Sequence, residues 1–259
     1  MSVDDNNAPA PVPGSSSNQS DSIPSDALII VPVRNTVLFP GVVFPITIGR
    51  PQSIAAAQQA VREQRQIGLL QQRDPETNEP GPDDLYRVGT LANIVRYITG
   101  PDDTHHVVCQ GVQRIQVLDF LTGTPFLAAR VLHIPEPTTT SPEIEARFLN
   151  LQRQAIEATE LLPQVPQELI AVLQGTTSPS TLADLATAYM DIKPQEKQEI
   201  LETVDLSLRM DKVSRHLAER IEVLRLSNEI GKQTKAPFIS RKIYDAAHRG
   251  GATIRTQRG

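Results

Sequence analysis

Two aspartates and two histidines lie close together in the segment "GPDDTHHVVCQ" and carry groups that bind metals. Asp102, Asp103, His105 and His106 supply carboxylates and imidazoles, which are common ligands of zinc. Adjacent residues of a strand point to opposite faces, however, so the two imidazoles cannot close on one ion without distortion. We therefore expect a polar hairpin tip here and no metal site.

Three further side chains have reactive groups, but the local sequence does not activate them. Cys109, the single cysteine, lies in the apolar stretch "HHVVCQ", and we interpret it as a small buried residue because no cation is placed beside it. Asp83 and Asp84 could form a carboxylate pair for acid–base chemistry. Nothing in their surroundings desolvates them, so we expect loop carboxylates.

The sequence contains no recognisable catalytic or nucleotide-binding motif. It has no G-x-x-x-x-G-K-[ST] loop, no G-x-G-x-x-G after a strand and no G-x-S-x-G elbow. No set of acid, base and nucleophile can be identified either. We therefore predict a protein that is not an enzyme and that needs no cofactor.

The composition excludes several classes of protein. The 259 residues carry a net charge of -5 and no tryptophan, which argues against a DNA-binding surface and against stacking platforms for single-stranded nucleic acid. No apolar run approaches the roughly 18 residues of a membrane span, and the polar start does not resemble a signal peptide. One cysteine suits a reducing compartment. We expect a cytoplasmic protein without a membrane partner.

The sequence pattern predicts five regions along the chain. They are an acidic, disordered arm (1–26), a β-rich domain (27–134), a Pro/Thr linker (135–142), a helical domain (143–236) and a basic tail (237–259). Ser53 is expected to cap the single helix of the β-rich domain, and Ser141 to cap the first helix of the helical domain. Pro237 is expected to end or kink the last, long helix. The expected strands are "ALIIVPV", "VVFPITIG", "IGLLQQ", "VGTLANIVRYI", "HHVVCQ", "RIQVLDFL" and "FLAARVLHI".

The most apolar stretch, "VPVRNTVLFPGVVFPITIGRP", contains an unusual number of prolines. Proline lacks a backbone donor and is confined to strand edges, strand starts, bulges and turns. We therefore expect Pro32 and Pro45 to act at strand edges, and Pro40 with Gly41 to fix the turn between the strands. Together the prolines would prevent the domain from pairing edge to edge with itself. The apolar residues before this turn either form a surface patch for unfolded chains or cap the end of the barrel.

Several segments together resemble the N-terminal domain of Lon-type ATP-dependent proteases. They are "PVRNTVLFPGVVFPITIGRPQSI", "DDLYRVGTLANI", "VVCQGVQRIQV" and "LETVDLSLRMDKVSRHLAERIEVLRLSNEI". The resemblance covers residues 28–235 and implies an α+β fold, with a small bent β-barrel-like (PUA-like) domain before a helical bundle that ends in a long helix. It implies binding of unfolded or degron-bearing polypeptides, without any catalytic residue in this sequence. The substrate-binding residues that it implies are Val37, Leu38, Phe39, Val42, Val43, Phe44, Leu85 and Tyr86.

The resemblance stops after Ala236. We therefore expect a free-standing domain, a truncated gene product or a chain with a foreign end. One alternative function is that of a regulator that assembles with a complete Lon protease. The other is nucleic-acid binding through the basic tail, which would be weak and sensitive to salt.

Overall fold

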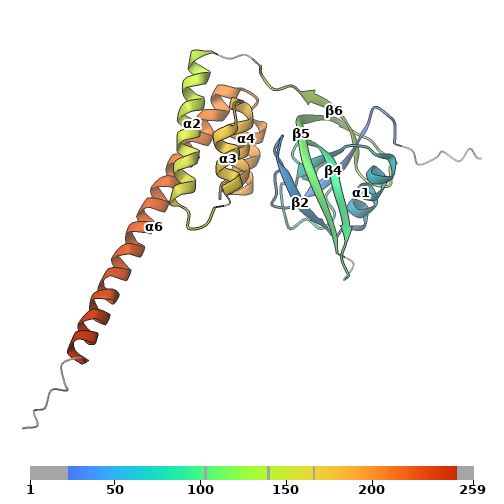
Figure 1. Cartoon of the computed structure of the whole chain (residues 1–259). Coiled ribbons are helices and arrows are strands. Elements are labelled where there is room, and N and C mark those ends of the chain that lie inside the picture. The colour runs from blue at the N-terminus through green and yellow to red at the C-terminus, as the bar shows by residue number, and fades with distance from the viewer. Residues whose placement is uncertain (1–22, 102–103, 139–140, 166, 250–259) are drawn as a thin grey trace, which may run out of the picture.

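The structure is a computed structural model that describes residues 23–101, 104–138, 141–165 and 167–249, with side chains through Ile230. A β-rich part comes first and a helical part follows, ending in the long helix α6 (Leu206–Arg249) (Figure 1). This arrangement confirms the expected α+β class. Residues 1–22 of the predicted disordered arm (1–26) fall outside the described residues, whereas Ile23 is described and buried. The side chains of the predicted basic tail also fall outside.

A strand of 16 residues, β5 (His105–Phe120), organises the sheet. One edge of β5 pairs with β4 (Val88–Thr99), and the other edge pairs first with β2 (Val43–Ile48) and then with β6 (Ala128–Ile134). The strand order is β2-β5-β4-β3-β1-β6, completed by β3 (Ile67–Gln71) and β1 (Leu28–Val33). Because β6 pairs back with β5, the sheet nearly closes into a ring, and β2 extends beyond it as an edge strand.

The segments "HHVVCQ" and "RIQVLDFL", which the sequence analysis treats as separate, form one continuous strand. β5 passes through Gly111 without a turn, and its pairing with β4 and β6 shifts register at three places. Such irregularities bend and twist a strand, which helps a small sheet to curve towards closure.

α1 (Pro51–Glu63) buries three alanines against the sheet. It begins at Pro51 after Arg50, so the prediction that Ser53 is the N-cap is wrong; Ser53 is buried in the first turn instead.

The prolines lie where the ladder does not need their nitrogen. In β1, the amide of Ile30 donates to the carbonyl of Leu127 at 2.8 Å, on the β6 side, and Pro32, two residues on, faces the same side. The β6 ladder reaches only Leu28 and Ile29, so Pro32 costs no hydrogen bond there. Pro45 lies in the edge strand β2. Pro45 therefore agrees with the prediction of an edge position, whereas Pro32 lies in an inner strand, in the part of it that β6 does not reach.

The helical part contains five helices over the described residues. Ser141 caps α2 (Pro142–Leu161) as predicted, by accepting a hydrogen bond from the amide of Ile144 at 3.2 Å. α2 and α4 pack against α6. α6 continues past Pro237, so of the two predicted effects of this proline, ending the helix is wrong, and a kink stays a prediction. The other helices are α3 (Gln167–Gly175), α4 (Pro179–Tyr189) and α5 (Pro194–Glu202).

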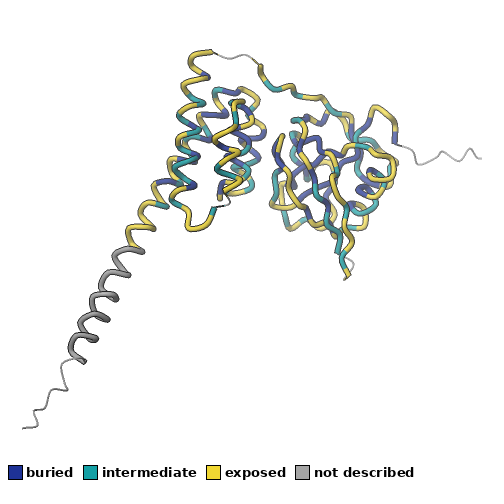
Figure 2. The backbone as a smooth tube through the Cα atoms, viewed as in Figure 1, coloured by how far each residue is buried: buried dark blue, intermediate teal, exposed yellow. Residues whose placement is uncertain are grey.

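Buried residues occur in both parts (Figure 2), and the larger of their two hydrophobic clusters extends through both. The cluster runs from Ile29 and Ile67 in the sheet, through Phe39, to Leu201 and Val213 in the helices. The two parts therefore share a hydrophobic core. Among the described residues, no helix has both the length and the hydropathy that a bilayer span requires.

Candidate functional site

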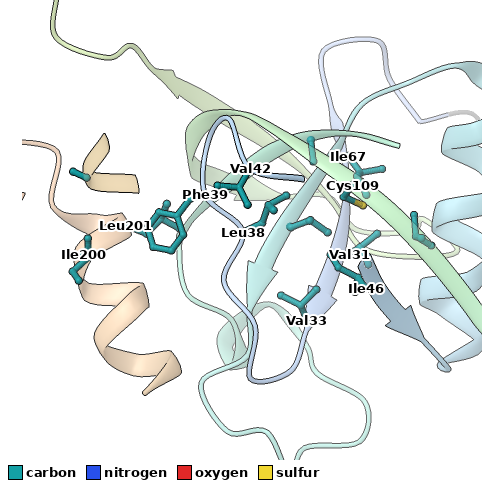
Figure 3. Packing of buried hydrophobic residues seen from close by; sticks show 14 of the residues in the cluster. Val31, Val33, Leu38, Phe39, Val42, Ile46, Ile67, Cys109, Ile200 and Leu201 are labelled. Atoms are coloured by element: carbon teal, nitrogen blue, oxygen red, sulfur yellow. The ribbon is translucent and has the colours of Figure 1, made fainter. Parts of the chain in front are cut away.

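The loop that leads into β2 carries a buried aromatic residue. Phe39 is completely buried and lies beside Leu201 of α5, at the junction between the sheet and the helices (Figure 3). Pro40 and Gly41 follow it in a tight turn, closed by a 3.2 Å hydrogen bond from the amide of Val42 to the carbonyl of Phe39. The φ of +77° at Gly41 is the left-handed value that a type II turn requires at this position. The turn thus fixes Phe39 against the helices.

The same loop is held against β5 and β4. The amide of Gly41 donates to the carbonyl of Gly111, and the amide of Gly111 donates to the carbonyl of Val42, both at 2.9 Å. Thr90 donates its hydroxyl to the carbonyl of Leu38 at 2.5 Å. A Cβ on Gly111 would lie 2.1 Å from the carbonyl oxygen of Phe39, so only glycine permits this close approach.

Most of the apolar residues around the turn are not at the surface. Leu38, Phe39 and Val42 are buried in the main hydrophobic cluster. Val43 and Phe44, by contrast, are 50% and 44% exposed. Of the two alternatives from the sequence, the buried residues fit the one in which they close the end of the barrel. Their role in binding remains a prediction.

The second predicted segment does not join the first. Leu85 is buried in a separate apolar cluster with Ile30 and Leu70, on a different side of the sheet core. Tyr86 is partly buried, and the guanidinium of Arg73 lies 4.7 Å from the centre of its ring. Val37, also partly buried, packs against the main cluster instead. The structure thus does not bring the eight predicted residues together in one site.

The edge strand β2 presents the accessible apolar residues of the set. Val43 and Phe44 are adjacent, so their side chains point to opposite faces of the strand. Because the amide of Gly111 donates to the carbonyl of Val42, the backbone groups of Val42 and of every second residue after it point towards β5. Pro45 falls between these residues, so its backbone nitrogen faces the free edge of β2. The edge offers apolar side chains on both faces, while Pro45 interrupts backbone pairing with another strand.

Sequence reasoning missed a buried network of charges at the junction. Arg114 of β5 reaches Asp184 of α4 through two hydrogen bonds of 2.6 and 2.9 Å, and donates to the carbonyl of Leu201 at 3.0 Å. Arg209 of α6 binds Glu136 at 2.7 Å and lies 3.6 Å from Asp184. Arg114, Asp184 and Arg209 are each at most 1% exposed. The only local signal for this network was a lone charged residue within an apolar segment, such as Asp184 in "STLADLATAYM".

Glu136, in the segment that connects the two parts, completes the network. It accepts hydrogen bonds from Arg114, from Arg209 and, at 2.6 Å, from the hydroxyl of Ser180. Burial alone would raise the pKa of Glu136, but the bonds from Arg209 and Ser180 and the charge of Arg114 lower it to about 2. Two guanidinium groups thus face two carboxylates, and the buried charges balance.

Within this network, Glu136 predicts a contribution to stability that is lost in acid. The pKa of Glu136 is lower in the folded chain, about 2, than its ordinary value of 4.5. Its contribution is therefore present above pH 4.5 and is lost as the pH falls towards 2. We expect it to amount to about 2 kcal/mol after allowance for partial solvent exposure. Urea unfolding of the wild type and of Glu136→Gln between these pH values measures this contribution. The difference between their free energies of unfolding should shrink as the pH falls. A difference that stays constant would contradict the lowered pKa of Glu136.

Among the residues whose side chains could do chemistry, the two histidines form hydrogen bonds within the sheet and Cys109 lies in the core. His105 is hydrogen-bonded to the hydroxyl of Tyr97 at 2.8 Å and His106 to the hydroxyl of Thr47 at 3.0 Å, so each histidine has a different neighbour. Asp102 and Asp103 lie outside the described residues. Cys109 is buried, and burial raises its pKa to about 12. Within the described part of the chain, no cluster of three His, Cys, Asp or Glu is arranged to hold a metal ion.

The loop pair Asp83 and Asp84 follows the expectation from the sequence. Asp84 accepts a 2.8 Å hydrogen bond from the amide of Gly81 around the short 3-10 helix η1 (Pro82–Asp84). Asp83 is exposed and lies 3.9 Å from Arg87. Both carboxylates support local loop structure.

Comparison with known proteins assigns the family. The family model of the ATP-dependent protease La (LON) substrate-binding domain matches residues 27–219, which include all six strands and most of the helices. This chain belongs to the Lon substrate-binding domain family. The resemblance noted in the sequence is thereby confirmed.

Lon proteases of several bacteria are similar to the chain in sequence. That of Methylocella silvestris is 55% identical over 234 residues, which are 90% of this chain and 29% of the relative. That of Phenylobacterium zucineum is 54% identical over 221 residues, which are 85% of this chain and 28% of the relative. The chain therefore spans less than a third of the length of these Lon proteases, and their catalytic domains are not in the aligned region.

Solved structures of Lon N-terminal domains share the fold. The N-terminal domain of the Mycobacterium avium complex Lon protease superimposes with a TM-score of 0.63 at 23% identity, covering 74% of this chain and 98% of that domain. A Lon N-terminal domain protein from Xanthomonas campestris has a TM-score of 0.52 at 14% identity and covers 72% of this chain and 96% of its own. The predicted Lon N-domain fold is confirmed.

Proposed function

We propose that this Lon-type domain binds unfolded or degron-bearing polypeptides and is the recognition part of ATP-dependent proteolysis. The observation that carries the proposal is the match of a substrate-binding family model to residues 27–219. Unfolding and cleavage would belong to domains outside the region that aligns with the Lon proteases. The domain itself would contribute apolar contact surface.

The edge strand β2 is the proposed contact for an unfolded chain. Val43 and Phe44 are exposed, and they lie next to the loop that Phe39 fixes against the helices. A rigid support lowers the entropic cost of binding because little of the surface must be ordered. An extended polypeptide could lie along β2 and contact apolar side chains without pairing over the whole edge, since Pro45 lacks a donor there.

Substitution of Phe44 tests the proposal. We expect Phe44→Ser to weaken binding of a permanently unfolded, fluorescently labelled protein by roughly tenfold, because covering the exposed part of an aromatic ring contributes on the order of 1–2 kcal/mol. Fluorescence anisotropy measures the affinity, and thermal unfolding checks that the variant keeps the wild-type stability.

Leu132 of β6 provides a matched control, because it is also about half exposed, at 52%, but lies away from β2. Leu132→Ser should bind as the wild type does. A folded wild-type domain that shows no affinity for unfolded protein would refute the proposed function. Equal losses in both variants would refute β2 as the contact.

A further inference from the structure

Two adjoining cavities beside β1 and α1 share a pair of arginines. The first cavity has a volume of about 440 Å³ and the second about 570 Å³. Both are lined by Pro32, Arg34, Gly49, Arg50 and Ser53, and we call the combined feature the arginine groove. The first cavity also has apolar walls, formed by Ile30, Phe126 and Leu127.

The two guanidinium groups lack carboxylate partners among the described residues. Arg34 donates to the side-chain oxygen of Asn78 at 3.3 Å, and Arg50 donates to the side-chain oxygen of Gln72; both lie 3.5 Å from the carbonyl of Thr77. The Nε of Arg50 is buried and has no hydrogen-bond partner in the described structure. Glu79 also lines the first cavity, but it forms no ion pair with either arginine. A buried donor without a partner is costly unless a ligand satisfies it.

The electrostatics of the groove favour an anion. Burial, together with the positive charge of Arg34, lowers the pKa of Arg50, so the two cations repel each other and a bound negative charge would relieve that repulsion. The first turn of α1 adds to this field, because Pro51, Gln52 and Ser53 line the cavity and the turn contains no acidic residue. The positive end of the helix dipole attracts anions in the same way.

We propose that the arginine groove binds the C-terminal residue of a polypeptide, with its free α-carboxylate on Arg34 and Arg50 and its apolar side chain against Ile30, Phe126 and Leu127. This inference rests on the proposed function, since it names a substrate class for polypeptide binding. Guanidinium groups bind carboxylates through paired, charge-assisted hydrogen bonds.

The mixed lining of the groove favours a chain end over other anions. A C-terminal residue carries a carboxylate and a side chain on the same Cα, which matches two cations next to an apolar wall. An inorganic phosphate would leave the apolar wall unused. Gly49 contributes to the room available: a Cβ built on it would meet nothing within 4 Å, so a larger residue there would occupy the groove without a backbone clash.

Short fluorescent peptides that differ only at their C-terminus test the proposal. One peptide ends in leucine with a free carboxylate, and its partner ends in the same leucine as an amide. We expect the free acid to bind the wild-type domain about tenfold more tightly, because the amide loses a charge-assisted hydrogen-bonding group. Arg34→Gln and Arg50→Gln should each abolish this preference.

Arg62→Gln is the matched control, because it removes one exposed arginine from the other end of the same helix, and it should keep the preference. If Arg50→Gln is unstable, the Arg34→Gln variant, whose arginine is exposed, still shows whether the preference for the free acid over the amide depends on the groove. Gly49→Leu offers a second route, since it should reduce binding of both peptides by filling the groove.

The possible outcomes separate this inference from the proposed function. Equal binding of acid and amide, with unfolded protein still bound, would overturn the C-terminal site and leave the proposed function intact. Loss of peptide binding on addition of inorganic phosphate, without any acid–amide difference, would identify a phosphate site and also overturn it. Failure to bind either peptide or unfolded protein would refute both.

Discussion

Replacing Asp184 with alanine is expected to lower the free energy of unfolding by about 4 kcal/mol. The carboxylate of Asp184 is 1% exposed and faces Arg114 at 2.6 Å and Arg209 at 3.6 Å. Removing it leaves two buried guanidinium groups with only Glu136 as a counter-charge, and breaking a buried pair on one side typically costs 3–5 kcal/mol. Urea unfolding followed by circular dichroism measures the change.

Asp211 supplies the control for this prediction. It also binds an arginine, Arg147, at 2.9 Å, but its side chain is 48% exposed. Asp211→Ala should cost less than about 1 kcal/mol, as exposed ion pairs do. A double variant, Asp184→Leu with Arg114→Met, should recover part of the lost stability because it removes a charge of each sign. Equal effects of Asp184→Ala and Asp211→Ala would contradict the role assigned to the buried network.

Phe39→Ala is expected to destabilise the domain by about 3–4 kcal/mol. The ring is fully buried between the β-rich part and Leu201, and its removal opens a cavity that the fixed turn at Pro40 and Gly41 cannot close. The cost should appear as lower stability of the sheet and the helices together, since both contribute to one core. Chemical denaturation, monitored separately in the near and far ultraviolet, would report it.

Phe44→Ala is the matched comparison, five residues further along the chain and 44% exposed. It should change the free energy of unfolding by less than about 1 kcal/mol. The two variants thus distinguish a structural phenylalanine from an accessible one. If Phe39→Ala kept full stability and lost only polypeptide binding, the junction would not depend on Phe39, and the buried arrangement described here would be incorrect.

Local patterns in the sequence predicted much of the fold. Apolar and β-rich segments separated by turn residues predicted the strands of the sheet, and Ser141 with Pro142 predicted the start of α2. These features depend on neighbouring residues, through hydrogen bonds and backbone preferences that act over a few positions. Local preference was a weak guide at two positions: α1 starts at Pro51, two residues before the expected cap Ser53, and α6 does not end at Pro237.

The candidate sites were much less accessible to such reasoning. Sequence alone placed Leu38, Phe39 and Phe44 together as apolar residues near a turn, and it could not tell which would be covered. Arg34 and Arg50 are separated from each other by the whole of β2, and nothing in their spacing indicates a shared cavity. Two segments must fold against each other before such a cavity exists.

The amino-acid sequence by itself determined the class of the fold, the turn at Pro40 and Gly41 and the Lon family to which the chain belongs. Only the tertiary structure decided that Phe39 is covered by Leu201, that Arg114 meets Asp184 across 70 residues, and that two arginines line one groove. The physical reason is that backbone preferences are local. Burial and charge pairing depend on segments distant in the sequence that come together only in the folded chain.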